Sequence, residues 1–316
     1  MGRRRHIVGA LAAAGLAVVL AGCSAGTPTV SVAYAGSLAT LMDQQLGPAF
    51  AQAEHVAYQG RGGGSFGLAR EIAAGTVPAD VFFSLGTAPL DSLRSKTSWA
   101  VRFATSPLVV AYNPKSPYAP ALDEIRTGRR PIQDLFSLMA QPGFHLGRTN
   151  PATDPQGRAF YLMVLLAQQL YHLPAGTARK VLGPPDNPRQ VFSETGILSQ
   201  LQAGALDAAS AFLPEAVERH LPYIALPNAL NFADPADAPL YAQASFTLPR
   251  VGTVRGAPLA VVGTVLNQSR LGLRFLTYAL SPAGRRIFEE DGYRWIPFTY
   301  WGNAAKVPAA VRHESP

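Results

Sequence analysis

The stretch that decides the fold reads GRTNPATDPQGRAF and runs from Gly147 to Phe160. It connects an expected strand at residues 144 to 146 with a helix expected over residues 155 to about 171. Asp154 stands at the N-cap position of that helix, and Pro155 follows at the first helical position, where the missing N–H of proline has no cost. Because the start of a helix presents unpaired N–H groups and a partial positive charge, this stretch predicts an anion-binding site.

Two earlier stretches have the same strand-to-helix build. An alternating strand at residues 30 to 34 leads to Ser37, the expected N-cap of the next helix. A glycine-rich stretch leads to Ser65, at or near the N-cap of a helix expected at residues 66 to 74. A buried strand then ends at Ser84. Strands and helices alternating at this spacing predict parallel α/β units, in which ligands gather at the carboxyl ends of the strands. The alternative for each serine is the common one of a helix cap that binds no ligand.

A proline within an apolar run divides the chain into two lobes. Residues 101 to 112 are apolar, and Pro107 in their middle would break a central strand, so we interpret this run as a connector. The predicted organisation assigns residues 29 to 106 and 245 to 300 to lobe 1, residues 107 to 244 to lobe 2, and residues 301 to 316 to a loose tail.

The first 22 residues have the features of a secretory signal peptide. Three arginines precede an apolar run at residues 7 to 20 that is too short to span a bilayer as a stable helix. The sequence LAGC then ends at Cys23, in the order of a bacterial lipobox, and this cysteine is the only one in the chain. The sequence predicts an exported lipoprotein, anchored to the extracytoplasmic face of the cell membrane through Cys23, with residues 23 to 28 as a tether. The alternative is an ordinary exported protein with an unmodified cysteine.

The charge of the exported part excludes some partners. The leader holds 3 of the 27 lysines and arginines and none of the 20 acidic residues, so the formal charge after cleavage is 24 − 20 = +4. This charge is too small to indicate nucleic-acid binding, and no basic cluster with interleaved aromatic residues occurs. It suits a protein that collects anions. The six histidines show no paired spacing, so we expect no metal site built from side chains.

The glycine-rich stretch from Gly62 to Gly67 matches two enzyme motifs, G-x-G-x-x-G and G-x-S-x-G. A dinucleotide site needs an acidic residue at the end of the second strand, whereas Asp80 comes before that strand. A hydrolase needs several strands before its nucleophile, and Ser65 comes too early in the exported chain. We therefore expect no enzyme and keep a hydrolase that uses Ser65 as the less favoured alternative.

Five stretches, taken together and in order, carry a resemblance to a known family. They are Ala35 to Leu38, Gly64-Ser65 with Leu68 to Ile72, Pro78 to Val81, Gly147 to Phe160, and Leu280 to Gly284 with Gly292-Tyr293. The chain resembles the molybdate- and tungstate-binding proteins that supply ABC importers, within the type II periplasmic-binding-protein superfamily. The resemblance implies an α/β fold of two lobes with the ligand in the cleft between them. It implies a binding protein without a cofactor, whose partners are a small oxyanion, molybdate or tungstate, and the membrane subunits of an importer.

The resemblance also implies a set of ligand-binding residues. These are Ser37 and Ser65 as hydroxyl donors, Ser84 and Leu85 as a turn with a backbone donor, and Asp154 as a carboxylate that reaches the central metal of the oxyanion. Tungstate-type members take a second carboxylate from a Glu-Tyr pair on a later strand. This chain has no Glu or Tyr from Ala208 to Pro214, and Glu215 lies beyond them in a different position. The departure leaves open a simple tetrahedral site or another anion such as sulfate. A binding protein for a different solute, or a sensor lobe without an importer, is a separate alternative.

Overall fold

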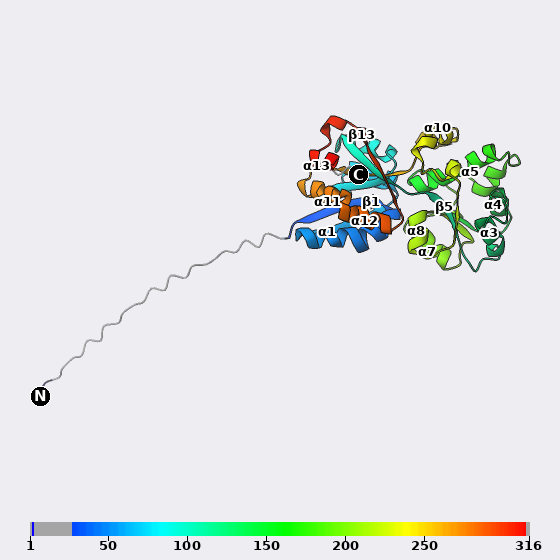
Figure 1. The fold of residues 1–316 in the computed structure, drawn as a ribbon, viewed down its shortest axis with the longest axis horizontal. Helices are drawn as coiled ribbons and strands as arrows, with labels where there is room; N and C mark the ends of the chain where they lie inside the picture. The colour runs from blue at the N-terminus through cyan, green and yellow to red at the C-terminus, as the bar shows by residue number, and fades with distance from the viewer. Residues whose placement is uncertain (1, 3–26, 314–316) are drawn as a thin grey trace.

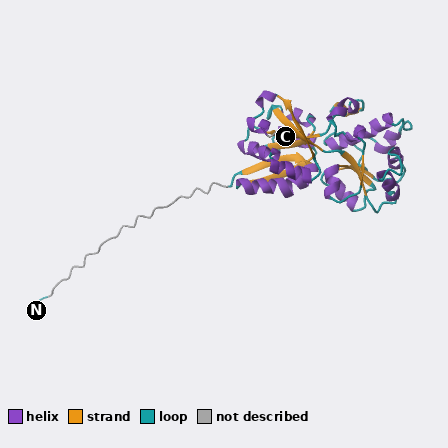
Figure 2. Cartoon of the chain, viewed as in Figure 1, coloured by secondary structure: helices purple, strands orange, loops and turns teal. Residues whose placement is uncertain are grey.

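The computed structural model describes residue 2 and residues 27 to 313, and two α/β lobes lie side by side in it (Figure 1). Apart from residue 2, the predicted signal peptide lies outside the described residues, as do Cys23 and the last three residues of the predicted tail. Within the described part, every helix is too short or too polar to cross a bilayer. Helices surround the strands of each lobe (Figure 2), as expected for α/β units.

Lobe 1 is built on a six-stranded sheet in the order β13-β4-β12-β3-β1-β2. β1 pairs in parallel with both β2 and β3, as the alternation of strands and helices predicts, whereas β12 is antiparallel to β3 and β4. The strands are β1 (Thr29–Ala35), β2 (Ala57–Gly63), β3 (Val81–Leu85), β4 (Trp99–Thr105), β12 (Ala260–Val265) and β13 (Arg294–Gly302). The main helices are α1 (Gly47–Glu54), α2 (Ser65–Ala74), α11 (Arg270–Leu280) and α12 (Pro282–Glu290).

Lobe 2 is built on a five-stranded sheet in the order β7-β6-β8-β5-β9. Its strands are β5 (Leu108–Tyr112), β6 (Leu146–Thr149), β7 (Val191–Phe192), β8 (Ala208–Phe212) and β9 (Tyr223–Ala225). Its helices are α3 (Ala119–Arg126), α4 (Gln133–Met139), α5 (Pro155–Leu170), α6 (Thr177–Leu182), α7 (Ile197–Gln202), α8 (Leu213–Glu218), α9 (Asn228–Asn231) and α10 (Ala238–Tyr241). The hairpin of β10 (Ser245–Leu248) and β11 (Gly252–Arg255) packs on α5, where the rings of Tyr161 and Phe246 stack with centroids 4.3 Å apart.

The apolar run around Pro107 forms two strands rather than a single connector. β4 lies inside the sheet of lobe 1 and β5 lies inside the sheet of lobe 2, so the chain passes between the lobes at Ser106 and Pro107. Proline lacks a backbone donor and is therefore tolerated in this gap and not within either strand.

The end of the chain is more ordered than the sequence suggests. The residues expected to form a loose tail include the end of β13, a short 3₁₀ turn at Ala304–Lys306 and α13 (Ala309–His313). Val307 and Val311 are buried against the core of lobe 1, which explains why this segment folds.

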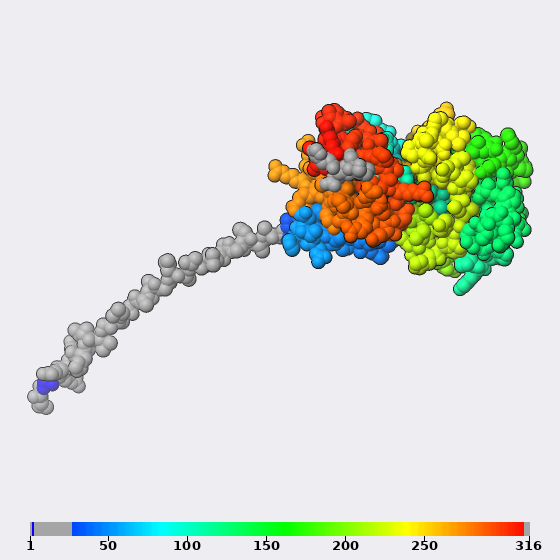
Figure 3. Space-filling view, viewed as in Figure 1, coloured from blue at the N-terminus to red at the C-terminus, as the bar shows by residue number. Residues whose placement is uncertain are grey.

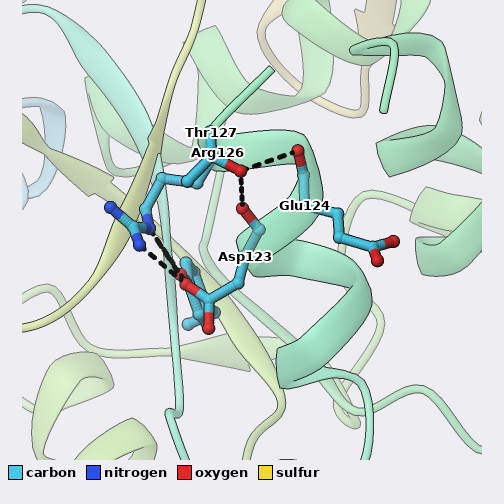
Figure 4. Close-up of polar contacts among 5 residues, drawn as sticks. Asp123, Glu124, Arg126 and Thr127 are labelled. Atoms are coloured by element: carbon cyan, nitrogen blue, oxygen red, sulfur yellow. Dashed lines mark hydrogen bonds and ion pairs between the residues drawn. The ribbon is translucent and has the colours of Figure 1, made fainter. Parts of the chain in front are cut away.

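A polar cluster fastens α3 to β5 in lobe 2 (Figure 4). The buried Tyr112 donates its hydroxyl to Asp123 Oδ1 at 2.5 Å, and Arg126 Nε donates to the same oxygen at 3.0 Å. Thr127 Oγ1 closes the helix end by donating to the Asp123 carbonyl at 2.8 Å. The hydrogen bond from Tyr112 is the main cause that holds the pKa of Asp123 below its usual value.

We expect Tyr112→Phe to lower the free energy of unfolding by about 1 kcal/mol, the size of one hydrogen bond to a partly exposed carboxylate. A depressed pKa contributes stability above the unfolded pKa of about 3.9 and loses it as the pH falls through the lower folded value. The difference between the two proteins should therefore shrink below about pH 4, as measured by urea unfolding at several pH values. Tyr118→Phe is the matched control, and an equal loss in both variants would contradict this role.

Candidate ligand-binding site

The three strand ends of lobe 1 face the start of α5 in lobe 2. β1, β2 and β3 end beside one another because they are parallel neighbours, and they deliver Ser37, Ser65 and Ser84 to one edge of the sheet. The backbone N–H of Gly67 in α2 donates to the Thr153 carbonyl across the cleft at 3.0 Å. The space-filling view shows the two lobes in contact on the face toward the viewer (Figure 3). Because the Gly36 N–H of lobe 1 also donates to Glu194 Oε2 of lobe 2 at 2.7 Å, the cleft is closed.

Ser37 does not cap a helix, contrary to the expectation from its position. It lies inside a 3₁₀ turn, Gly36–Leu38, whose N-cap is Ala35. The Ser37 carbonyl accepts a hydrogen bond from the hydroxyl of Tyr293 at 3.1 Å, which fixes the turn. The Ser37 Oγ is buried and has no hydrogen-bond partner among the described residues. A buried hydroxyl without a partner is costly, so this oxygen is poised for a ligand.

Ser65 is the first residue of α2, and the N-cap of that helix is Gly64. Its fully buried hydroxyl accepts only a long bond, 3.4 Å, from the backbone N–H of Leu85. The Ser84 hydroxyl donates to the Gly86 carbonyl at 2.8 Å, which shapes the turn that carries Leu85. The structure thus places Ser65, Ser84 and Leu85 together, with the Leu85 donor directed at Ser65.

Asp154 is the N-cap of α5, as the sequence predicts. Its Oδ1 accepts a hydrogen bond from the backbone N–H of Gln156 at 2.7 Å, and its side chain is buried. Burial, the largest cause, raises the pKa of Asp154 to about 6. The carboxyl is therefore able to carry a proton under mildly acidic conditions.

Glu194 is a site residue that the sequence reasoning missed. It lies in the loop between β7 and α7, and its Oε2 accepts a hydrogen bond from the Gly36 N–H of lobe 1 at 2.7 Å. Its Oε1 has no partner among the described residues. Burial and the neighbouring carboxyls of Asp154 and Glu215 raise its pKa well above the usual value. The signal in the sequence was an acidic residue between a strand and a helix, at the edge where ligands gather.

Gly36 makes room for this contact. A Cβ at Gly36 would lie 2.7 Å from Glu194 Oε2, closer than unbonded atoms approach. The glycine therefore permits a carboxylate oxygen, or an anion in its place, to reach the backbone N–H. Glu194 occupies the position that an oxyanion bound at this donor would take.

Glu215 is a third buried carboxyl, and it lies in α8 just after Pro214, outside β8. Its Oε2 accepts from the Phe212 N–H at 2.7 Å and from Gln156 Nε2 at 2.8 Å. Ser210 donates in turn to Gln156 Oε1 at 2.9 Å. Burial is the main reason that the pKa of Glu215 rises to about 8. β8 carries no acidic residue, and the nearby Glu215 links the start of α8 to α5 instead.

Arg148 and Arg158, the two arginines of residues 147 to 160, form no ion pair with these carboxyls. The fully buried Arg148 donates to backbone carbonyls and to Gln190, and its pKa falls to about 10 through burial. Arg158 donates to the Pro151 carbonyl at 3.1 Å and lies 3.6 Å from the ring centroid of Phe66. Among the described residues, Asp154, Glu194 and Glu215 have no ion-pair partner. Burial therefore favours their neutral forms, and a neutral carboxyl can donate a hydrogen bond.

The arrangement suits a small anion better than a metal cation. Within residues 27 to 313, no group of three or more histidine, cysteine, aspartate or glutamate side chains is placed to hold a metal ion. The hydroxyls of Ser37 and Ser65 and the backbone N–H groups of Gly36 and Leu85 gather at this boundary instead. A cavity of about 130 Å³ beside Leu85 and Pro155 is lined by Arg158 and Arg255, which place positive charge next to the site.

Two α/β lobes that meet across a cleft, where hydroxyl and backbone donors gather, have the fold of the type II periplasmic binding proteins. The Azotobacter vinelandii periplasmic molybdate-binding protein has this fold, with a TM-score of 0.57, 19% identity, and coverage of 84% of this chain and 98% of its own. Residues 30 to 294 match the family described as bacterial extracellular solute-binding protein, and the chain belongs to that family.

Two relatives carry names that include a ligand. A Haloferax volcanii protein, named as a candidate ABC transporter molybdenum-binding protein, is 34% identical over 260 residues, covering 81% of this chain and 79% of its own. The molybdate/tungstate-binding protein WtpA of Pyrococcus abyssi is 28% identical over 239 residues, covering 68% and 67%. This chain is therefore similar to binding proteins of ABC importers along most of its length.

Proposed function

We propose that this solute-binding protein captures a tetrahedral oxyanion, molybdate or tungstate, outside the cell and delivers it to the membrane subunits of an ABC importer. It performs no catalytic step, and Cys23 anchors it to the membrane through a lipid. The observation that carries the ligand class is the buried, unpartnered hydroxyl of Ser37, next to the Gly36 N–H that a carboxylate oxygen already occupies. The names of the relatives support the choice of anion.

The proposed site holds the anion through hydrogen bonds. Ser37 and Ser65 donate their hydroxyl protons, and the Gly36 N–H exchanges Glu194 for a ligand oxygen. Asp154 carries a proton in the bound state and becomes a donor, because a second negative charge beside a dianion in a buried site is unfavourable.

The proton on Asp154 predicts how affinity depends on pH. Between pH 8 and pH 6, Asp154 is ionised in the free protein and takes up one proton on binding, so the affinity for molybdate should rise by up to about tenfold per pH unit as the pH falls. Below the pKa of about 6 the affinity should level off. Titration calorimetry in matched buffers measures both the affinity and the proton uptake.

Asp154→Asn is the matched variant, since asparagine caps a helix equally well and cannot ionise. Its affinity should depend on pH less steeply than that of the unsubstituted protein, and the dependence that remains comes from Glu194 and Glu215, whose pKa values burial also raises. Affinity that instead rises with pH would mean that the ionised carboxylate coordinates the central metal, and it would contradict the protonated site.

A ligand panel tests the proposed anion directly. Thermal unfolding of the chain without its leader is compared with molybdate, tungstate, sulfate, phosphate and several sugars. A ligand that binds only the folded state adds about 2.7 kcal/mol of stability at roughly 100 times its Kd. We expect the unfolding midpoint to rise with molybdate and tungstate. A rise with sulfate alone would mean that the ligand is sulfate and not molybdate or tungstate. No rise with any anion would refute an oxyanion function.

The lipid anchor has a separate test. In the native host, Cys23→Ala should move the protein from the membrane fraction to the soluble exported fraction without changing its response to the anion. Retention in the membrane fraction would contradict the anchor.

A further inference from the structure

A basic cavity lies at the end of lobe 1 opposite the ligand cleft. Its volume is about 570 Å³, and its lining includes four cationic side chains and no acidic one. The cations are Arg94, Lys96, Arg270 and Lys306. They come from three separate segments: the turn before β4, the start of α11 and the 3₁₀ turn after β13. We define this surface as the basic pole.

The pairing of the strands shows at which edge of the sheet the basic pole lies. β12 runs antiparallel to β3 and ends at Val265, which pairs with Val81 at the start of β3. The cavity lining includes Val265 and Trp99, the first residue of β4. β1 begins at this same edge with Thr29 and ends at the cleft edge. The seven residues of β1 separate the two edges, a distance of roughly 20 Å at about 3.3 Å per residue.

Most of the positive charge at the basic pole is not neutralised. Arg94 pairs with Asp91 at 2.6 Å and lies over the ring of Trp301. Within residues 27 to 313, Lys96, Arg270 and Lys306 have no carboxylate partner. Arg270 and Lys306 are exposed, and Lys96 is half-buried inside the cavity. A concave surface with three free cations attracts a phosphate group by charge and by shape.

The chain enters the fold at the same pole. The Pro28 carbonyl accepts a hydrogen bond from the Ala57 N–H, so the fold begins just before β1. Cys23 precedes Thr29 by six residues, and six residues span at most about 20 Å. A lipid on Cys23 would therefore hold this pole, and not the cleft, next to the bilayer surface. In Figure 1, α11 and α13 lie on the side of lobe 1 where the described chain begins.

We propose that the basic pole docks on the anionic lipid headgroups of the membrane that holds the anchor, with headgroup phosphates entering the cavity. The orientation rests on the proposed lipid anchor, whereas the surface itself does not depend on which anion the cleft binds. Docking in this way leaves the cleft about 20 Å from the lipid, open to solute. Anionic surfaces attract basic residues that lie within a Debye length of them.

The test measures how the protein binds to vesicles when it lacks its covalent anchor. The chain from residue 23 onward, carrying Cys23→Ala, is mixed at low ionic strength with vesicles of phosphatidylglycerol and phosphatidylcholine or of phosphatidylcholine alone. We expect binding to the anionic vesicles only, weakened by added salt. The double variant Arg270→Glu, Lys306→Glu should bind at least about tenfold more weakly, since each basic residue near such a surface contributes about fivefold.

The matched control is Arg179→Glu, Lys180→Glu on α6 of lobe 2, which changes the net charge equally at exposed positions. Equal weakening in both double variants would show attraction by overall charge alone and would overturn the proposal, as would no binding to anionic vesicles. Millimolar glycerol phosphate serves as a competitor. If it abolishes vesicle binding and raises the unfolding midpoint, the cavity is a site for a soluble phosphate ester and the membrane proposal fails. All variants should keep the molybdate response, so failure here is distinct from failure of the proposed function.

Discussion

The double variant Ser37→Ala, Ser65→Ala should lose the response to molybdate and tungstate. Each hydroxyl donates to a charged ligand oxygen in the proposed site, and hydrogen bonds to charged groups contribute about 1.5–3 kcal/mol each. Losing both should weaken binding by more than about 100-fold, as measured by titration calorimetry and by the shift in unfolding midpoint.

The stability of this variant without ligand should hardly change. The Ser37 Oγ has no partner, and the Ser65 Oγ takes part only in the 3.4 Å bond with Leu85. A loss of binding therefore cannot be assigned to unfolding. Ser92→Ala, Ser137→Ala is the matched control, with both serines exposed on the surface. A double variant of Ser37 and Ser65 that binds the anion with unchanged affinity would refute this site.

Of the substitutions proposed for this protein, Arg148→Leu should lower the free energy of unfolding the most. The buried guanidinium donates to Gln190 Oε1 at 3.2 Å and to the carbonyls of Pro184 at 2.8 Å and Pro185 at 2.9 Å, with longer bonds to Leu182 and Thr149. Leucine leaves these acceptors buried without a donor. Removing one partner of a buried charged network costs about 3–5 kcal/mol, which urea unfolding can measure.

The same variant should also weaken ligand binding, because Arg148 joins the two loops of lobe 2 that carry site carboxyls. Its own strand, β6, leads to Asp154, and the segment that it holds leads through β7 to Glu194. Arg179→Leu, at an exposed position, should change the unfolding free energy by less than about 0.5 kcal/mol. Similar stability in both variants would contradict the structural role of Arg148.

Much of the site can be predicted from local sequence. Asp154 caps α5 because an N-cap bonds the N–H two residues later, a contact that needs no tertiary structure. The ends of β1 and β3 were predicted from apolar runs, and the parallel pairing then brings Ser37 and Ser84 to one edge. The prediction that Ser37 caps a helix was wrong, since its turn is 3₁₀ and leaves the hydroxyl free.

Burial and long-range contacts could not be predicted in the same way. Glu194 lies 158 residues after Gly36, and only closure of the lobes brings its carboxylate to that N–H. Arg148 lies in the stretch that predicts the anion-binding site, yet it satisfies the carbonyls of a neighbouring loop.

The sequence by itself determined the alternation of strands and helices, the capped helix of Asp154 and the strand ends that carry the serines, because turns, caps and apolar periodicity depend on neighbours in the chain. Tertiary structure alone decided which carboxyls are buried together and which hydroxyls remain without a partner. Desolvation and hydrogen-bond satisfaction depend on every segment that packs around a group, so the protonation of Asp154, Glu194 and Glu215 follows only from the folded, closed protein.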